Sequence, residues 1–367
     1  MRALTTYHDE IGASAGRGGY ARAVAAARLL FDTRDALARL FGVPDSKRVV
    51  FTLNATEAIN LALQGYLAAG DHVVTTSMEH NSVARPLRHL ERDRGIKVTF
   101  VPCSSEGLLD PASVDAAIGP DTKLVAVIHA SNVCGAINDV AAVGEICRRR
   151  GVRLFVDAAQ TAGSVPIHME DMGIDLLAFP GHKGLMGPLG TGCLCLGADV
   201  ELRPLVMGGT GTNSGLRFQP DSLPDRYEAG SHNALGIAGL KAAVDFVSRV
   251  TPQAIGRHKA SLAEMFAKAV GKSRHVRYYG PSDFTRNAGV CSVTVEGMDA
   301  ATVGLKLDAE YGIMVRTGLH CAPLAHETLG TTATGTVRFS FGFFNTREDA
   351  EAAASALLAL AEGPRML

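Results

Sequence analysis

Short apolar segments typical of strands alternate with helical segments through the first two thirds of the chain. The strand-like segments are 48–53, 72–76, 97–101, 124–128, 154–157, 176–179 and 192–196. Helical periodicity marks 56–67, 83–92 and 140–150. Strands that are separated by helices and are apolar along their length are typical of parallel sheets covered on both faces. The sequence therefore predicts an α/β fold with a mostly parallel, seven-stranded sheet between layers of helices.

The pattern of predicted elements changes after Thr251 and Pro252. The helical stretches that follow are 255–270, 300–310 and 347–361, and the strand-like stretches are 290–295, 313–316 and 337–341. A chain of 367 residues is long enough for a large domain and a smaller one. We therefore expect a large domain at 16–250 and a small α+β domain at 251–367, to which residues 1–15 also belong.

Charge and composition exclude several classes of partner. The formal net charge of −1 provides no basic field to attract nucleic acid or an anionic membrane. The N-terminus has no apolar signal region, and no apolar run is long enough to cross a bilayer. The seven cysteines form no CxxC pair, which is typical of reduced thiols. We expect a cytoplasmic protein with no metal site, no membrane contact and no nucleic-acid partner.

Lys183 follows an apolar strand that ends in Pro180 and Gly181, within the run 176–184 (LLAFPGHKG). Charged side chains are rare at the ends of buried strands. A partly desolvated amine with a lowered pKa can form a Schiff base and then act as a base. When Lys183 is considered alone, a surface lysine in a glycine-rich turn is the simpler explanation.

Asp157 lies at the carboxyl end of the strand-like run 154–157, where ligands bind in parallel α/β sheets. A buried carboxylate there needs a cationic partner. The protonated pyridine nitrogen of pyridoxal 5′-phosphate (PLP) is one such partner, and it makes the ring an electron sink. A helix N-cap or a structural ion pair explains Asp157 equally well by itself.

Polar residues follow three other predicted strands. Thr56 lies at a helix start whose free N–H groups suit a phosphate, although Thr56 or Asn54 could simply be an N-cap. His80 could stack on a flat ring or move protons, and Asn132 could donate to a ring hydroxyl. A loop histidine is more often incidental, and an asparagine after a strand can serve as a turn residue.

Cys321 is the candidate nucleophile among the seven cysteines. It lies beside His320 and near Arg316, in a loop of small and turn residues. Cationic neighbours and exposure favour the thiolate, although an inert loop cysteine fits the same sequence. Arg338 interrupts a later strand pattern. A buried arginine there could bind a carboxylate through two hydrogen bonds, whereas an edge-strand arginine would form a surface salt bridge.

Together these motifs resemble those of the class V, fold-type I PLP enzymes, and among them the cysteine desulfurases related to selenocysteine lyase. The resemblance runs from about Gly16 to Thr346. Its most specific parts are 54–58 (NATEA), 79–81 (EHN), 156–160 (VDAAQ), 181–183 (GHK) and 316–321 (RTGLHC). The resemblance implies the fold-type I architecture and PLP as the cofactor.

The resemblance also implies roles for individual residues. It implies that PLP forms a Schiff base with Lys183 and that Asp157 pairs with the pyridine nitrogen. The other cofactor contacts that it implies are Ala55, Thr56 and His182 at the phosphate, His80 on the ring face, and Asn132 and Gln160 at the ring hydroxyl.

On the substrate side, the resemblance implies that Cys321 accepts the sulfur and that Arg338 binds the substrate carboxylate, with Arg316 and Asn132 as further contacts. It also implies a homodimer in which the segment 228–233, including Ser231, reaches the phosphate site of the partner subunit.

Three departures from the family pattern are visible. The family usually opens with a strand that contains Asn-Ala-Ala-Thr, which is not found before Gly16, so we expect a shortened or reassigned start. Ser231 stands where threonine is usual and keeps a hydroxyl, whereas His232 stands where proline is usual and should loosen the turn. The short loop between Cys321 and Arg338 resembles that of the selenocysteine-lyase-like group.

The predicted function is a cysteine desulfurase that converts L-cysteine to L-alanine and forms a persulfide on Cys321 for an acceptor protein or small thiol. Selenocysteine lyase is a close alternative. A class V aminotransferase or epimerase is another, and there Cys321 would be incidental. A PLP-binding sulfur-transfer partner without turnover belongs to a different class.

Overall fold

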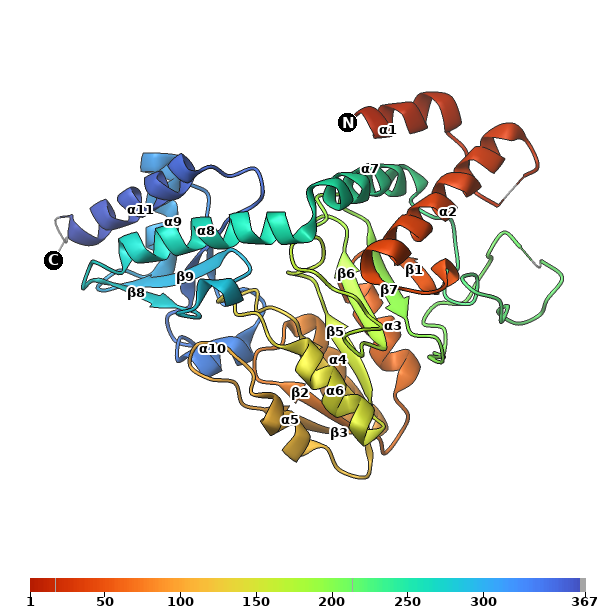
Figure 1. Ribbon diagram of the computed structural model, residues 1–367, viewed down its shortest axis with the longest axis horizontal. Coiled ribbons are helices and arrows are strands. Elements are labelled where there is room, and N and C mark those ends of the chain that lie inside the picture. Colours follow the sequence, from red (N-terminus) through yellow and green to blue (C-terminus); the bar gives the residue numbers. More distant parts are fainter. Residues whose placement is uncertain (17, 213, 364–367) are drawn as a thin grey trace.

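The chain folds around two separate β-sheets in the computed structural model, which describes residues 1–16, 18–212 and 214–363. Within these residues the first sheet, here the large sheet, has seven strands in the order β1-β7-β6-β5-β4-β2-β3. Their bounds are β1 (Val49–Thr52), β2 (His72–Thr76), β3 (Lys97–Val101), β4 (Thr122–Ile128), β5 (Arg153–Asp157), β6 (Leu176–Pro180) and β7 (Gly192–Leu196). Only β7 runs antiparallel to its neighbours. The predicted mostly parallel sheet is therefore confirmed (Figure 1).

Alternate residues of each central strand face different helical layers. In β5, Leu154 and Val156 join a core formed with helices on one face, while Phe155 joins the core on the other face. The first core is covered by α2 (Ala21–Phe41), α5 (Pro111–Ala117), α6 (Val140–Arg150) and α7 (Ala234–Val250). The second core is covered by α3 (Ala55–Tyr66) and α4 (Asn81–Arg94). Burial on both faces explains why these strands are apolar along their whole length.

The second sheet, here the small sheet, is antiparallel and has four strands within the described residues, in the order β10-β11-β9-β8. Their bounds are β8 (Val276–Tyr279), β9 (Val290–Val295), β10 (Arg316–Gly318) and β11 (Thr336–Ser340). The helices of this region are α8 (Pro252–Val270), α9 (Ala300–Tyr311), α10 (Pro323–Leu329) and α11 (Arg347–Glu362), with the 3₁₀ turn η3 (Phe284–Arg286). α8 extends from the end of α7 across to the small sheet (Figure 1).

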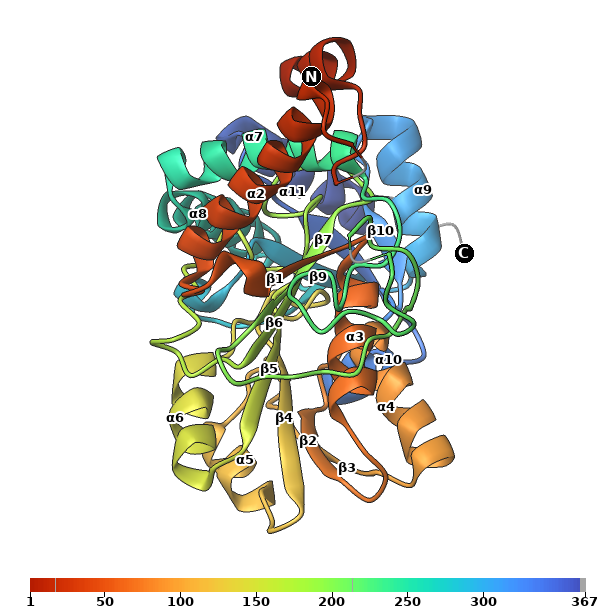
Figure 2. The ribbon, with the colours of Figure 1, turned by 90° about the vertical axis from the view of Figure 1, so that its right-hand side faces the viewer.

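The N-terminal segment lies on the large-sheet side of the molecule. α1 (Arg2–Thr6) and the π-helical turn η1 (Tyr7–Ile11) contact α7, and η1 also contacts α2 (Figures 1 and 2). We expect from the sequence that residues 1–15 belong to the small domain. In the structure, α1 and η1 instead pack against α7 and α2, which cover the large sheet. A short 3₁₀ turn, η2 (Ser46–Arg48), leads into β1. Residues 364–367, which fall in the expected small domain, lie outside the described residues.

None of the helices within the described residues is long and apolar enough to cross a membrane. All seven cysteines lie in the described part of the chain, and all seven are free.

Candidate active site

Eight of the residues singled out in the sequence line one pocket at the carboxyl ends of the large-sheet strands. They are Ala55, Thr56, His80, Asn132, Asp157, Gln160, His182 and Lys183. These residues lie at or just after the carboxyl ends of five different strands. Since parallel strands bring their carboxyl ends to the same edge of a sheet, residues far apart in sequence meet here.

Lys183 is presented by the tight turn that follows β6. A Cβ on Gly181 would collide with the side chain of Thr191, so glycine is required just before His182 and Lys183. Lys183 is exposed in the open pocket, yet the crowded protein atoms around its amine lower the pKa, mainly through desolvation. The carboxylate of Asp157 acts in the opposite direction, and Arg338 lowers the pKa further. An amine in this position can lose its proton more easily than an ordinary lysine.

Asp157 ends β5 and is almost completely buried. Its Oδ1 accepts a hydrogen bond from the Ala159 N–H at 2.8 Å. Burial raises the pKa of this carboxyl, while the Ala159 N–H and the charge of Lys183 lower it. A cationic group placed in the pocket beside Asp157 would stabilise its charged form.

His80 is the N-cap of α4 and remains neutral. Its Nδ1 accepts from the Ser82 N–H at 3.0 Å, so the ring proton resides on Nε2. Desolvation and the nearby Lys183 and Arg316 lower its pKa to about 4. The Ser82 hydroxyl also lies 2.8 Å from the Thr56 hydroxyl, so the loops that carry Thr56 and His80 are joined directly.

The start of α3 provides free backbone donors. Asn54 is the N-cap, and its side chain accepts from the Glu57 N–H at 3.0 Å. The N–H groups of the first helical residues, Ala55 and Thr56, point out of the helix toward its N-terminal end. With His182 on the same pocket wall, this end of the pocket suits an anionic group.

Cys321 and the two arginines come from the small sheet and the loop after it. Arg316 and Arg338 are paired across β10 and β11. Arg316 donates to Cys321 Sγ at 3.0 Å, so its guanidinium can stabilise negative charge that develops on the sulfur. Arg338 donates to the backbone oxygen of Asn132 at 2.9 Å. Asn81 donates its N–H to the Cys321 carbonyl at 2.9 Å, so this loop lies against the large-sheet pocket.

The other six cysteines are unsuitable as nucleophiles. Five are buried and Cys103 is half-buried, whereas Cys321 is exposed. Burial raises the pKa of Cys103 to about 11 and that of Cys147 to about 12. These thiols therefore remain protonated near neutral pH, and solvent reaches most of them poorly.

Several buried polar atoms of the site find no hydrogen-bond partner within the described residues. They are Asn132 Oδ1, His182 Nδ1, Arg338 Nε and Glu79 Oε2. Unpaired buried polar atoms are rare and unfavourable. Three of them belong to residues already expected to contact a cofactor or substrate, so a ligand with polar groups fits this place.

Glu79 is a site residue that the sequence reasoning did not single out. Its Oε1 accepts from the Thr76 hydroxyl at 2.7 Å and from the Ile128 N–H at 2.9 Å. Complete burial raises its pKa to about 8, and the nearby charge of Asp157 adds to the effect. Its position within the EHN motif was the only sequence signal, and the motif does not reveal burial.

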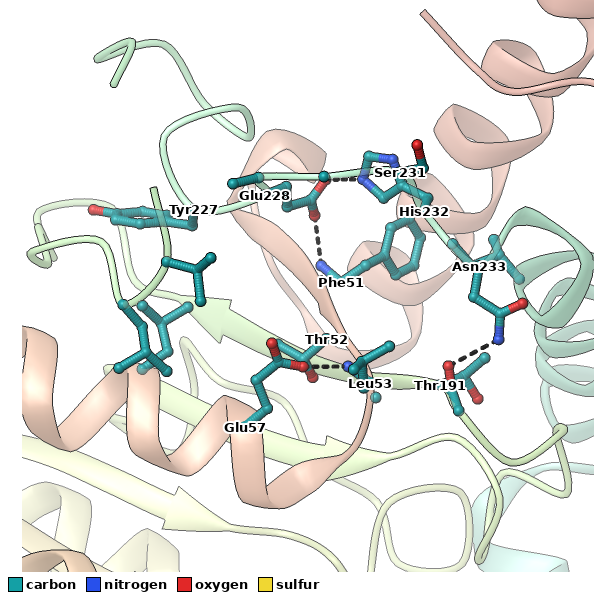
Figure 3. Close-up of a pocket in the computed structure, with 18 residues that line it drawn as sticks. Phe51, Thr52, Leu53, Glu57, Thr191, Tyr227, Glu228, Ser231, His232 and Asn233 are labelled. Carbon is teal, nitrogen blue, oxygen red and sulfur yellow. Dashed lines mark hydrogen bonds and ion pairs between the residues drawn. The ribbon is translucent and has the colours of Figure 1, made fainter. Parts of the chain in front are cut away.

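Ser231 lies in a different pocket, between the end of β1, the start of α3, the start of β7 and the segment 228–233 (Figure 3). Glu228, at the beginning of this segment, forms a buried ion pair with Arg34 of α2. His232 Nε2 lies 2.6 Å from Glu228 Oε2. His232, which we expect from the sequence to loosen the turn, thus contacts the buried ion pair.

Three comparisons with known proteins agree. The family model described as Aminotransferase class-V matches residues 1–353. A probable cysteine desulfurase of Methanothermobacter thermautotrophicus is 37% identical over 95% of this chain and 88% of that protein. The apo cysteine desulfurase of Thermococcus onnurineus NA1 superposes with a TM-score of 0.93, at 33% identity, over 99% of this chain and 91% of that one. The Escherichia coli cysteine desulfurase CsdA gives a TM-score of 0.87 at 29% identity, over 98% and 91% of the two chains.

Proposed function

Because the chain belongs to the class-V aminotransferase family, we infer that it is a cysteine desulfurase, which converts L-cysteine to L-alanine and retains the sulfur. The observation that carries this function is Cys321. It is an exposed thiol with the Arg316 guanidinium 3.0 Å from its sulfur, beside a pocket that contains a lysine of lowered pKa. A class V aminotransferase or epimerase would have no need of such a thiol.

We propose PLP as the cofactor of this pocket. The fit is supported by the unpaired polar atoms of Asn132 and His182, by the free N–H groups at the start of α3, and by the buried Asp157. Ala55, Thr56 and His182 would hold the phosphate, Asp157 the pyridine nitrogen, Asn132 and Gln160 the ring hydroxyl, and His80 the ring face. PLP, when bound, withdraws electrons from the substrate Cα and so acidifies the Cα proton.

Four side chains of the site then have separate roles in the reaction. The amine of Lys183, whose pKa is lowered by desolvation, removes the Cα proton. Asp157, in its charged form, would stabilise the protonated pyridine nitrogen of the cofactor. Arg338, whose Nε has no hydrogen-bond partner within the described residues, binds the substrate carboxylate. The neutral ring of His80 would pack on the face of the cofactor ring.

Sulfur transfer takes place at Cys321. Its thiolate attacks the substrate sulfur, so an S–S bond forms and the C–S bond breaks, with the electron pair of that bond staying on the carbon. The carbon takes up a proton and alanine leaves, while Cys321 becomes a persulfide. The overall balance is cysteine plus a thiol giving alanine plus a persulfide. An acceptor protein or a small thiol then reduces the persulfide.

We also propose a homodimer in the cytoplasm. Large apolar side chains are exposed in the segment that precedes Ser231, among them Met207 (72% exposed) and Phe218 (87% exposed). Their burial against a second copy would remove apolar surface from water. The seven free thiols support a reducing compartment.

The test is to incubate the purified, PLP-loaded protein with L-cysteine and a reductant and to measure alanine and sulfide together. We expect equal amounts of both. A yellow protein that releases neither product would exclude the desulfurase and favour a binding partner without turnover. A parallel assay with selenocysteine separates the desulfurase from a selenocysteine lyase through the relative rates, and amino transfer to a keto acid would identify an aminotransferase.

A further inference from the structure

Cys321 and its neighbour His320 form a sharp corner in an unusual backbone conformation. The φ angles are 50° at His320 and 60° at Cys321. Residues with a side chain rarely adopt this left-handed region, and they remain there only where the surroundings hold them. The Cys321 carbonyl accepts from the Asn81 N–H, and the His320 carbonyl accepts from the Asn132 side chain at 2.8 Å. Both carbonyls of the corner are therefore fixed to residues that follow strands of the large sheet, Asn81 at the start of α4 and Asn132 after β4.

The side chains of the two residues point to opposite environments. Cys321 is exposed, whereas His320 is only 2% exposed. The His320 ring places Nε2 2.9 Å from the Thr336 hydroxyl. It thus anchors the corner to β11, the strand that also carries Arg338.

A chain of hydroxyl groups defines which ring nitrogen of His320 carries the proton. Ser292 donates to the Val133 carbonyl at 2.6 Å, and that carbonyl can only accept. Thr336 donates to the Ser292 hydroxyl at 3.2 Å. The Thr336 oxygen is then free only to accept, so His320 must donate from Nε2.

The other nitrogen and the nearby charges keep this tautomer neutral. His320 Nδ1 is buried and has no hydrogen-bond partner within the described residues. Desolvation, together with the nearby Arg338, His326 and Arg316, lowers the pKa of His320 to about 3. The second buried histidine, His326, faces it at a ring-centroid distance of 5.5 Å and also has a lowered pKa. The ring therefore stays an uncharged donor.

We propose that His320 is a positioning residue for Cys321: its Nε2–H anchor to Thr336 holds the left-handed corner so that the thiolate faces the bound substrate. The proposal rests on the proposed desulfurase function. The ring anchor joins His320 to Thr336, and neither side chain is among those proposed to hold the cofactor or remove the Cα proton. We therefore expect it to affect only the step that needs the Cys321 sulfur.

Two substitutions separate the anchor from backbone strain. His320→Asn suits a left-handed backbone better than histidine does, but its amide is too short to replace Nε2. His320→Gln keeps a donor near the Nε2 position without favouring the left-handed backbone. We expect His320→Asn to lower alanine release from L-cysteine about 10- to 100-fold in kcat, and His320→Gln to restore most of it.

β-Chloroalanine is a control substrate whose reaction does not need the Cys321 sulfur. Its chloride leaves without attack by a thiol, so pyruvate formation reports the cofactor pocket and Arg338 but not Cys321. We expect both His320 variants to process β-chloroalanine like the native protein. Desulfuration by His320→Asn at the native rate, or an equal loss in both reactions, would overturn the proposal.

The hydroxyl partner allows a second test if His320→Asn folds poorly. Thr336→Val keeps the shape and removes the acceptor, so it should reproduce the selective loss, while Thr336→Ser should restore activity. The rate of Cys321 alkylation by iodoacetamide distinguishes this proposal from the proposed function. If the native protein makes no alanine from cysteine, the function fails, but a change of alkylation rate in Thr336→Val that Thr336→Ser reverses would still support the anchor, and unchanged rates would refute it.

Discussion

The two sheets contribute opposite environments to the same site. On the large-sheet side, desolvation moves pKa values far from their ordinary range, to about 8 for Glu79 and about 4 for His80. On the small-sheet side, the reactive thiol of Cys321 is exposed and rests against Arg316. The large-sheet half is crowded around Glu79 and His80, although Lys183 itself is exposed, whereas the small-sheet half presents its reactive thiol to solvent.

This difference matches the two stages of the proposed reaction. Removal of a Cα proton benefits from a desolvated amine and from charges that act in a low dielectric. Transfer of sulfur to an acceptor requires a thiol that another molecule can reach. If the comparison holds, substitutions on the large-sheet side should affect every reaction of the cofactor, and those on the small-sheet side should affect only reactions that need Cys321.

The largest expected effect is that of Lys183→Ala. Loss of the base should lower both alanine release from cysteine and pyruvate release from β-chloroalanine by roughly 10²- to 10⁴-fold. Lys259→Ala is a matched control, because Lys259 lies on α8 outside the pocket and burial lowers its pKa to about 8. Retention of either reaction at the native rate in Lys183→Ala would contradict the assignment of the base.

The next effect should be confined to one reaction. Cys321→Ala should keep the absorbance of the bound cofactor and the β-chloroalanine reaction, but reduce sulfide and alanine release from cysteine to background. Cys103→Ala serves as the control, since Cys103 is half-buried with a pKa of about 11. Full desulfuration by Cys321→Ala would remove the persulfide step from this protein.

Much of this arrangement can be predicted from the sequence, because it depends on short-range patterns. The strands β4 to β6 are largely apolar, and the residues after them meet at one sheet edge by the geometry of parallel strands. Helices α2 and α7 were missed. α7 contains Gly236 and Gly239 and several β-branched residues, which weaken a helical pattern although tertiary packing stabilises it.

Other features depend on contacts between distant segments. The strand expected at 313–316 is instead β10 at Arg316–Gly318, because its register is set by pairing with β11. The contact of Arg316 with Cys321 depends on the left-handed corner, and the protonation of Glu79 depends on complete burial. No local pattern encodes either feature, so only the folded chain reveals them.

A smaller effect is expected from Arg316→Met, which tests the open half. Without the Arg316 hydrogen bond, the negative charge that develops on the Cys321 sulfur as it reacts should be less well stabilised, and alkylation by iodoacetamide should slow roughly three- to tenfold. Arg316→Lys retains the charge and should slow it less. If alkylation were as fast in Arg316→Met as in the native protein, Arg316 would have no part in activating the thiol.

The smallest change in turnover is expected from Glu79→Gln, whose main effect should be on the pH dependence of stability. The ordinary pKa of 4.5 is raised to about 8 in the folded state, so between these pH values the folded protein binds more protons than the unfolded chain. Its free energy of unfolding therefore falls as pH rises from 4.5 to 8, by at most about 1.4 kcal/mol per pH unit from this group. Glutamine carries no such proton, so the stability of Glu79→Gln relative to the native protein should increase from pH 5 to pH 9 in urea unfolding. Glu145→Gln makes the same substitution at an exposed position of α6 and is the matched control. Parallel pH profiles for Glu79→Gln and the native protein would mean that the pKa of Glu79 is not raised in the folded state. Desolvation at this position of the large-sheet half would then be weaker than its burial suggests.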